Sequence, residues 1–274
     1  MKLQTLLFTS LALTLVGCAA PPVVNCEANL SYVPTGAELQ FSYLDNVPRR
    51  NREREALVAN AFESLGCATS RARVARRNAH NIMCVIPGTS DREIWVSAHH
   101  DSLGSGRGVA DNWTGITVLL SLARHYASEP PKHTLRLIAF ADEERDLKGA
   151  HHMAQQLKSG IYPAPVALVN VDTLGIRQLA YDSGSDPWLA CAARQVASAQ
   201  NVDIMERRLT DMSGDWLPFK RAGIPSLHLH GLDADAMKYL HTYRDRRELV
   251  DDEKLQQAFT VIADLLALLD HHQL

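Results

Sequence analysis

The chain has 274 residues, of which 46% are hydrophobic, and it contains 15 glycines and 12 prolines. These values are ordinary for a globular protein, so we expect one α/β domain or one domain with small additions. The formal net charge of −3 gives no indication of a nucleic-acid partner, which would need a strongly basic surface.

The first eighteen residues differ from the rest of the chain. Lys2 gives a positive start, residues 6–16 are mostly apolar, and Leu-Val-Gly-Cys18 is followed by small residues and prolines. This pattern is typical of a secretory signal and is too short for a permanent membrane span. Its end resembles a bacterial lipobox, which implies that Cys18 becomes the lipidated first residue. An ordinary cleaved signal peptide is the alternative.

These features predict the organisation and the location of the protein. A lipid on Cys18 would anchor the mature chain to a membrane. Ala19, rather than Asp, follows that cysteine. By resemblance to sorted lipoproteins, this favours the outer membrane, with the protein facing the periplasm. We expect a signal peptide at 1–17, a tether at 18–35 and a single domain at 36–274.

The other cysteines indicate at least one disulfide. An exported protein can oxidise its thiols, and four cysteines allow three pairings, among which the sequence does not choose. No Cys-x-x-Cys pair is present, so we do not expect a thiolate metal site. The four are Cys26, Cys67, Cys84 and Cys191.

Hydrophobic periodicity predicts alternating strands and helices along the chain. Such alternation requires crossover connections and indicates a mostly parallel sheet that is covered on both faces. The basic stretch from Arg71 to Arg77 is more typical of a solvated edge strand or loop. Helices are expected at 51–65, 114–126, 149–157, 187–199, 216–221 and 252–269, and strands at 81–86, 93–98, 133–140, 165–171 and 224–229.

Polar side chains follow the strand expected at 93–98. The residues Ala98-His99-His100-Asp101 would emerge at the carboxyl edge of the sheet, where ligand crevices lie in open α/β sheets. Residues two apart share a face in extended chain, so His99 and Asp101 can point together while His100 points away. A metal-bound histidine usually donates its other ring N–H to a carboxylate or carbonyl, and Asp101 is placed for that role.

Asp111 lies between a glycine-rich loop and the helix expected to begin at Thr114. Taken alone, it is most simply interpreted as a helix cap or a turn residue. The loop lacks the Lys-Ser/Thr ending of a P-loop and the full Gly-x-Gly-x-x-Gly pattern, which argues against phosphate binding.

Three adjacent carboxylates, Asp142, Glu143 and Glu144, follow the strand expected at 133–140. In a partly buried crevice they would repel one another unless a divalent cation or Arg145 balanced their charge. Because neighbouring Glu side chains diverge, one can bind a metal while the other faces a water molecule. An exposed acidic turn is the alternative.

Two further donors complete a possible metal site. Asp172 ends the strand expected at 165–171, and His241 lies beyond the strand expected at 224–229. Zinc takes imidazole nitrogen and carboxylate oxygen, and the set is large enough for two ions with one bridging carboxylate. The coincidence predicts a metalloenzyme whose donors are His99, Asp111, Glu144, Asp172 and His241.

The motifs, in this order, resemble peptidase family M28, a family of zinc metallopeptidases that are mostly aminopeptidases. The resemblance covers about residues 81–252 and implies a mixed, mostly parallel central sheet sandwiched by helices. The matching blocks are His99-His-Asp-Ser102, Asp111-Asn-Trp-Thr-Gly115, Phe140-Ala-Asp-Glu-Glu144 with Gly149-Ala150, Asn170-Val-Asp172, Gly223-Ile-Pro225 and His241-Thr242.

The resemblance also implies a role for each residue. Asp111 would bridge two zinc ions, Glu143 would be the general base, and Asp101 would support His99. The substrates would be peptides with a free N-terminus. In this assignment one zinc is completed by His99 and Asp172, and the other by Glu144 and His241.

Two stretches depart from the family pattern, so the substrate pocket and the residues that support the ligands can differ from the family's. Ser213-Gly214-Asp215-Trp216 stands where Ser-Asp-His is frequent, and His241-Thr-Tyr-Arg-Asp245-Arg246 stands where His-Thr-Pro-x-Asp-Thr is frequent. Asp215 is a candidate for holding the substrate amine. Trp113 and Trp216 are candidates for the first side-chain pocket, with core packing as the simpler interpretation.

Other functions stay open at this point. A glutaminyl-cyclase-like acyltransferase would bind one zinc through Asp111, Glu144 and His241, although the pairs Asp111-Asn112 and Leu147-x-Gly149 are more typical of aminopeptidases. A carboxypeptidase is a second alternative. The complete donor set argues against a binding module without catalysis. Six other histidines are expected to lie at the surface or in packing positions: His151, His152, His228, His230, His271 and His272.

Overall fold

The computed structural model describes residues 30–103, 105–208 and 213–271. Its centre is one mixed sheet in the strand order β1-β2-β4-β3-β5-β8-β6-β7. β3 runs parallel to β4 and β5, and β5 to β8, whereas β2 is antiparallel to β1 and β4, and β6 to β8. The strands are β1 Ala68–Arg73, β2 His80–Ile86, β3 Ser90–His99, β4 His133–Phe140, β5 Ala167–Asp172, β6 Ala180–Asp182, β7 Met205–Arg207 and β8 Ser226–His230.

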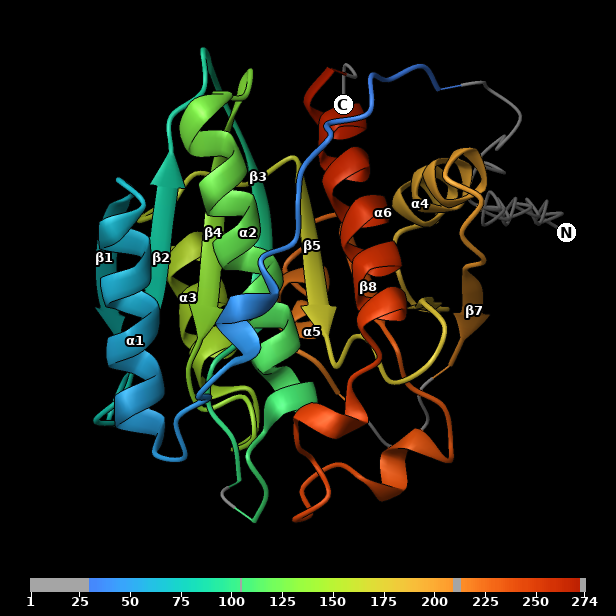
Figure 1. Cartoon of the computed structure of the whole chain (residues 1–274). Coiled ribbons are helices and arrows are strands. Elements are labelled where there is room, and N and C mark those ends of the chain that lie inside the picture. The colour runs from blue at the N-terminus through green and yellow to red at the C-terminus, as the bar shows by residue number, and fades with distance from the viewer. Residues whose placement is uncertain (1–29, 104, 209–212, 272–274) are drawn as a thin grey trace, which may run out of the picture.

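Helices cover both faces of this sheet (Figure 1). Successive strand residues point to opposite faces, so Val96 and Val169 join the core under α1, α2, α4 and α6. Their neighbours Trp95 and Leu168 join a smaller core under α3 and α5. The helices are α1 Asn51–Ser64, α2 Thr114–Ser128, α3 Lys148–Lys158, α4 Pro187–Ala199, α5 Trp216–Lys220 and α6 Asp252–His271, with short turns η1 Phe41–Leu44, η2 Val109–Trp113, η3 Ala236–Lys238 and η4 Arg247–Leu249.

The fold class expected from the sequence is confirmed. Every helix and strand that the sequence predicts is present, with ends displaced by a few residues. Arg71 and Arg73 lie on β1, at the edge of the sheet, as expected for the basic stretch. The strands β6 and β7 were not expected, because three residues each are too few to show a period of two.

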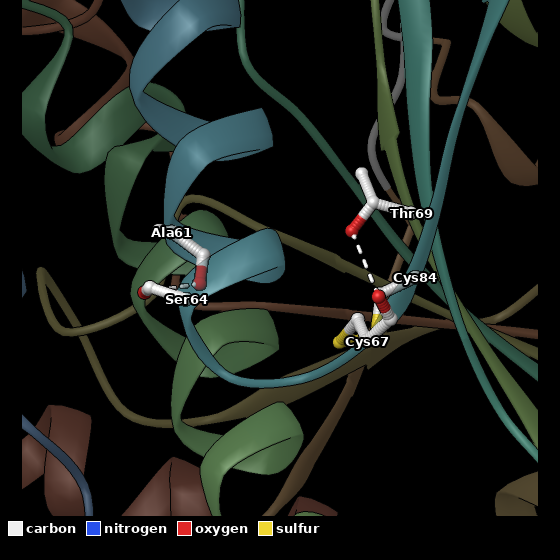
Figure 2. The surroundings of a disulfide bond; sticks show 5 residues. All are labelled: Ala61, Ser64, Cys67, Thr69 and Cys84. Atoms are coloured by element: carbon white, nitrogen blue, oxygen red, sulfur yellow. Dashed lines mark hydrogen bonds between the residues drawn. A yellow bond between two sulfur atoms is a disulfide. The ribbon is translucent and has the colours of Figure 1, made fainter.

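A disulfide joins Cys67, just after α1, to Cys84 on β2 (Figure 2). Cys84 is fully buried in the larger core. This bond is one of the pairings that the sequence left open, and it ties the loop after α1 to the sheet. Cys26 lies outside the described residues.

The signal peptide, Cys18 and most of the expected tether also lie outside the described residues. Residues 30–35, which we expected to belong to the tether, lie against the domain instead. The backbone N–H of Leu30 donates to Gln195 Oε1 on α4 (3.1 Å), and that of Thr35 donates to Asp264 Oδ1 on α6 (2.8 Å). No helix in the described part of the chain is long and apolar enough to cross a membrane.

Candidate metal centre

His99 and Asp101 lie at the carboxyl end of β3, as expected. His99 is the last residue of that strand, and its Nδ1 lies 3.2 Å from the backbone oxygen and 3.6 Å from Oδ1 of Asp101. This contact directs Nε2 toward the other donors. The Asp101 carboxylate also accepts hydrogen bonds from the backbone N–H groups of Glu143 (3.0 Å) and Glu144 (3.3 Å). Asp101 therefore holds two parts of the centre together, while His100 turns away toward β2.

Asp111 lies in the short turn η2, whose helical geometry is interrupted at Asp111 and Asn112; the peptide bond between them is cis. The two residues before Asp111 donate their backbone N–H groups to Asp245 Oδ1, at 2.9 and 2.7 Å. The side chain of Asn112 donates to the backbone oxygen of Val171 (2.9 Å), at the end of β5. In the described chain the backbone N–H of Gly115, in the first turn of α2, donates to Asn112 Oδ1 (3.0 Å) and not to Asp111, so the simple interpretation of Asp111 as a helix cap is wrong.

The three adjacent carboxylates after β4 point in different directions. Asp142 turns away and pairs with Arg77, with 2.7 Å between Oδ2 and Nε. Glu143 turns inward, and its Oε2 lies 3.9 Å from His99 Nε2. Glu144 turns toward the loop after β8. The divergence expected for Glu143 and Glu144 is therefore present, and Asp142 belongs to an ordinary ion pair.

The five predicted donors come together in two groups that share Asp111. In one group, His99 Nε2 lies 3.0 Å from Asp111 Oδ1 and 3.6 Å from Asp172 Oδ1. In the other, His241 Nε2 lies 3.1 Å from Asp111 Oδ2 and 2.8 Å from Glu144 Oε2. Within each group the ligand atoms all lie within 4.8 Å of one another. Asp111 thus offers one oxygen to each group, as a bridging carboxylate does.

Carboxylates outnumber cations at this centre, and the pKa values reflect the imbalance. Burial raises the pKa of Glu143 well above its ordinary value, and the charges of Asp215, Asp172 and Asp111 raise it further. Burial also raises the pKa of Asp215. Burial alone would lower the pKa of His99, but the charges of Glu143 and Asp172 outweigh it and raise that pKa well above its ordinary value. The centre therefore favours added positive charge.

The donor set fits divalent cations. Glu144 Oε1 and Asp215 Oδ1 are buried and have no hydrogen-bond partner in the described part of the chain, and burial of such oxygens is unfavourable. Hydrogen bonds to Asp111 and Glu144 raise the pKa of His241 to about 10, so the acids already attract a positive charge to this position. Two imidazole nitrogens with three carboxylates, one of them shared, form a set that suits zinc at both groups.

Comparison with known proteins identifies the family. Residues 81–266 match the model of peptidase family M28, and this range contains both donor groups. The chain belongs to peptidase family M28. The resemblance inferred from the sequence motifs is therefore confirmed.

Among curated relatives, the aminopeptidase YwaD of Bacillus subtilis is 29% identical over 177 residues, which cover 60% of this chain and 38% of YwaD. A probable zinc metalloprotease of Pyrenophora tritici-repentis is 33% identical over 151 residues, which cover 50% of this chain and 34% of that protein. The chain thus spans little more than a third of the length of these M28 relatives.

Solved structures share the fold. The zinc aminopeptidase BSAP from Bacillus subtilis has a TM-score of 0.60 at 26% identity, covering 69% of this chain and 49% of that one. The aminopeptidase LapA of Legionella pneumophila has a TM-score of 0.75 at 20% identity, covering 84% and 69%. A glutaminyl cyclase from an Acidobacteriales bacterium has a TM-score of 0.72 at 21% identity, covering 92% and 99%.

A cavity of about 390 Å³ adjoins the M28 centre on the side of Asp172, and Trp216 and His228 line it. The two rings stack with centroids 5.9 Å apart. Trp216 is 4% exposed and packs in the smaller core as well as lining the cavity, so it stays a candidate for the first side-chain pocket. The same expectation for Trp113 is wrong. Trp113 is fully buried in the larger core, and its Nε1 donates to the backbone oxygen of Tyr43 (2.8 Å).

The remaining described histidines join neither donor group. His228 Nδ1 lies 2.9 Å from the side-chain nitrogen of Asn170, and His230 Nδ1 accepts from the backbone N–H of Leu232 (3.1 Å). Burial lowers the pKa of His228 to about 4 and that of His230 to about 3. Both rings are therefore neutral and belong to neither donor group, although His228 also lines the cavity beside Asp172.

Arg54 is a supporting residue that the sequence analysis missed. Its side chain is fully buried on α1 and donates to the backbone oxygens of His100 and Gly108, the latter at 2.9 Å. It thereby ties the chain after β3 to the loop before Asp111. The sequence does contain a signal for its burial. Arg54 lies four and eight residues before Val58 and Phe62, and this helical spacing puts it on the apolar face of α1.

Asp245 is a second residue that supports the metal centre, a role that the sequence analysis did not assign to it. It lies in a stretch that departs from the M28 pattern, yet its carboxylate receives the backbone N–H groups of Val109 and Ala110. Asp245 therefore anchors the turn that presents Asp111 between the two donor groups. The departures on either side of it leave this anchoring contact in place.

Proposed function

We propose that this chain is a zinc-dependent aminopeptidase, an exopeptidase that hydrolyses N-terminal residues from peptides. The observation that carries the proposal is the pair of donor groups that share Asp111, with the buried Glu143 beside them. The zinc and aminopeptidase descriptions of the related proteins support it. Two zinc ions would be held by His99, Asp111 and Asp172 and by Asp111, Glu144 and His241. Zinc bound by these residues would polarise a carbonyl group and lower the pKa of a water molecule.

Glu143 is the general base in this proposal. It takes a proton from the attacking water and passes it to the nitrogen of the leaving group. A pKa raised by burial suits a carboxylate that must both accept and return a proton near neutral pH. Asp101 is a positioning residue, because it accepts the backbone N–H groups of Glu143 and Glu144 and faces His99 Nδ1.

The substrate would lie across the centre with its first residue on the side of Asp172. The cavity lined by Trp216 would receive the first side chain. Asp215 is buried, and its Oδ1 has no partner among the described residues. It lies between Gly214 and Trp216, which both line that cavity. A carboxylate in this position would hold the α-amine of the substrate, and that contact would restrict cleavage to the N-terminus.

The test is the hydrolysis of a panel of aminoacyl anilides and of the same compounds with an acetylated amine. We expect the free-amine compounds to be cleaved, the acetylated ones to resist, and a chelator to abolish activity that added zinc restores. Equal cleavage of both series would reject the aminopeptidase assignment. Activity that survives exhaustive chelation would reject the metal dependence.

A glutaminyl-cyclase-like acyltransferase is the second candidate. The observation in its favour is that the Acidobacteriales cyclase matches this chain over 99% of its own length. Such an enzyme would use a single zinc at Asp111, Glu144 and His241. Incubation with a peptide that begins with glutamine decides between them, because a cyclase leaves an N-terminal pyroglutamate and an aminopeptidase releases free glutamine.

We also propose that a lipid on Cys18 anchors the protein to the outer membrane, facing the periplasm. The disulfide between Cys67 and Cys84 suits an oxidising compartment. The described chain begins at the end of the molecule opposite to the carboxyl ends of β4 and β5 (Figure 1), so a tether at that end would leave the centre accessible. Cys18→Ser should move the protein from the membrane fraction to the soluble fraction; retention in the membrane would reject the anchor.

A further inference from the structure

A second and larger cavity, of about 650 Å³, shares no lining residue with the cavity beside Asp172. It is bounded by η1, by the loop before Asp111 and by the segment after His241. Four arginines line it, Arg49, Arg107, Arg246 and Arg247, with two carboxylates, Asp45 and Glu248. We call it the arginine cavity. The positive excess is local, since the chain as a whole carries a net charge of −3.

The arginines differ in how they are engaged. Arg247 pairs with Asp252 at 2.5 Å, and Arg246 Nε donates to the backbone oxygen of Tyr243 at 2.6 Å. Arg49 and Arg107 are exposed, and no side-chain ion pair joins either one to another described residue. Their guanidinium groups can therefore bind an anion from outside the chain, and the planar fork of arginine matches a carboxylate.

The cavity lies next to the metal centre. Gly106 lines both the arginine cavity and a small pocket formed with Asp111, Glu144 and His241. Val109 and Tyr243, which also line the arginine cavity, are each two residues from a donor. An extended peptide advances about 3.3–3.6 Å per residue, so one or two residues beyond the scissile bond suffice to reach the cavity.

Resting on the proposed function, we propose that the arginine cavity binds a carboxylate of the substrate on the leaving-group side, and that the enzyme prefers short peptides with a free C-terminus. In the proposed function, the first side chain of the substrate occupies the cavity beside Asp172 that Trp216 lines. The leaving part must then extend past Asp111 toward His241. Arg49 and Arg107 face it there and set the specificity for that part of the substrate.

The experiment compares kcat/KM for leucyl-leucine and leucyl-leucinamide, which differ only in the terminal carboxylate. We expect the free acid to be preferred about fivefold, the upper end of the effect of one ion pair between exposed groups. A second pair of dipeptide amides, ending in aspartate or asparagine, separates a side-chain carboxylate from the terminal one. A preference for the free acid together with equal rates for the two amides would assign the terminal carboxylate.

Arg49→Ala with Arg107→Ala should reduce the preference for the free acid to about twofold or less, mainly through KM. Arg107→Lys with Arg49 retained should preserve part of the preference for the free acid, because lysine keeps the positive charge at this position. Arg71→Ala, on the exposed edge strand β1, is the matched control and should leave the preference unchanged. Equal kcat/KM for leucyl-leucine and its amide in the wild type would overturn the proposal.

The proposed function has a separate readout. Leucyl-anilide carries no carboxylate, so its hydrolysis tests the aminopeptidase assignment without testing the arginine cavity. Calorimetric binding of leucyl-leucine and its amide to the Glu143→Gln variant gives the same comparison without turnover. Equal affinities there would overturn the role of the arginine cavity even if the anilide is cleaved, and a failure to cleave the anilide would reject only the proposed function.

Discussion

Two clusters of buried charge involve the neighbouring strands β3 and β4, and they are built differently. Glu93 on β3 accepts hydrogen bonds from Arg136 on β4, at 2.9 and 2.8 Å, and from Trp95 Nε1, at 2.6 Å. The Arg136 guanidinium also lies 5.6 Å from the centre of the Trp95 ring. One acid and one base satisfy each other there. This cluster is complete within the chain and has no need of a ligand.

The cluster at the carboxyl ends of the same strands is not balanced. His99 and His241 face a larger number of carboxylates, and Glu144 Oε1 and Asp215 Oδ1 have no partner among the described residues. The contrast teaches that buried charge alone does not identify a functional site. A functional site is indicated where carboxylates outnumber cations and the metal-ligating atoms of several side chains lie close together.

Glu143→Gln should have the largest effect on activity. The amide cannot take up the proton, so turnover of an aminoacyl anilide should fall about 10²–10⁴-fold, while zinc content stays at the wild-type level. Because burial raises the pKa of Glu143, its ionisation is less favourable in the folded metal-free protein than in the unfolded chain, so the folded state loses stability as the pH rises above the ordinary pKa of a glutamate. The same variant should therefore not lower the thermal stability of the metal-free protein. Near wild-type turnover would remove Glu143 from the mechanism.

Glu93→Gln makes the same chemical change in the cluster of Glu93 and Arg136. We expect it to lower the stability of the protein and to leave the activity unchanged. Arg136 would be left buried without its carboxylate, which typically costs about 3–5 kcal/mol. Urea unfolding should show this loss, whereas kcat for the folded fraction should match the wild type. A variant as stable as the wild type would show that this pair does not support the fold.

Removal of the disulfide with Cys67→Ser and Cys84→Ser tests the scaffold without changing any charge. The bond closes a loop with a sequence separation of 17, and loops of this size contribute about 3 kcal/mol. We expect a lower denaturation midpoint with unchanged zinc content. A loss of zinc in the folded variant would instead link this region to the centre.

Asp101→Asn should have the smallest of these effects. The amide keeps the shape but loses the charge that faces His99 Nδ1 and the backbone N–H groups after β4. Replacement of such supporting groups typically lowers metal affinity or activity about 10–100-fold. Zinc titration of the variant measures the first quantity and anilide hydrolysis the second. Wild-type values for both would mean that the backbone oxygen of Asp101 alone positions His99.

Much of this organisation could be predicted from the sequence, because it is encoded locally. The strands before His99 and Asp172 are short apolar runs, and parallel strands bring their carboxyl ends to one edge. The sequence alone therefore predicts that the donors after those runs lie together. The order of the motifs then indicated peptidase family M28, which the match over residues 81–266 confirms.

The features that were missed depend on contacts between distant segments. Arg54 sits on a helix with charges on its other faces, and only its partners around the loop before Asp111 explain its burial. The position of Trp113 depends on Tyr43, far away in the chain. The pairing of Cys67 with Cys84 depends on how β1 lies against β2. None of these follows from periodicity or motif spacing.

The binding of two cations at the Asp111 centre is tested most directly by the zinc content of the purified protein, measured by elemental mass spectrometry after dialysis against zinc. We expect about two zinc ions per chain in the wild type and a loss of both sites in Asp111→Ala, since that carboxylate serves both groups. Wild-type protein that is folded and still retains no zinc would contradict a metal centre at this edge of the sheet.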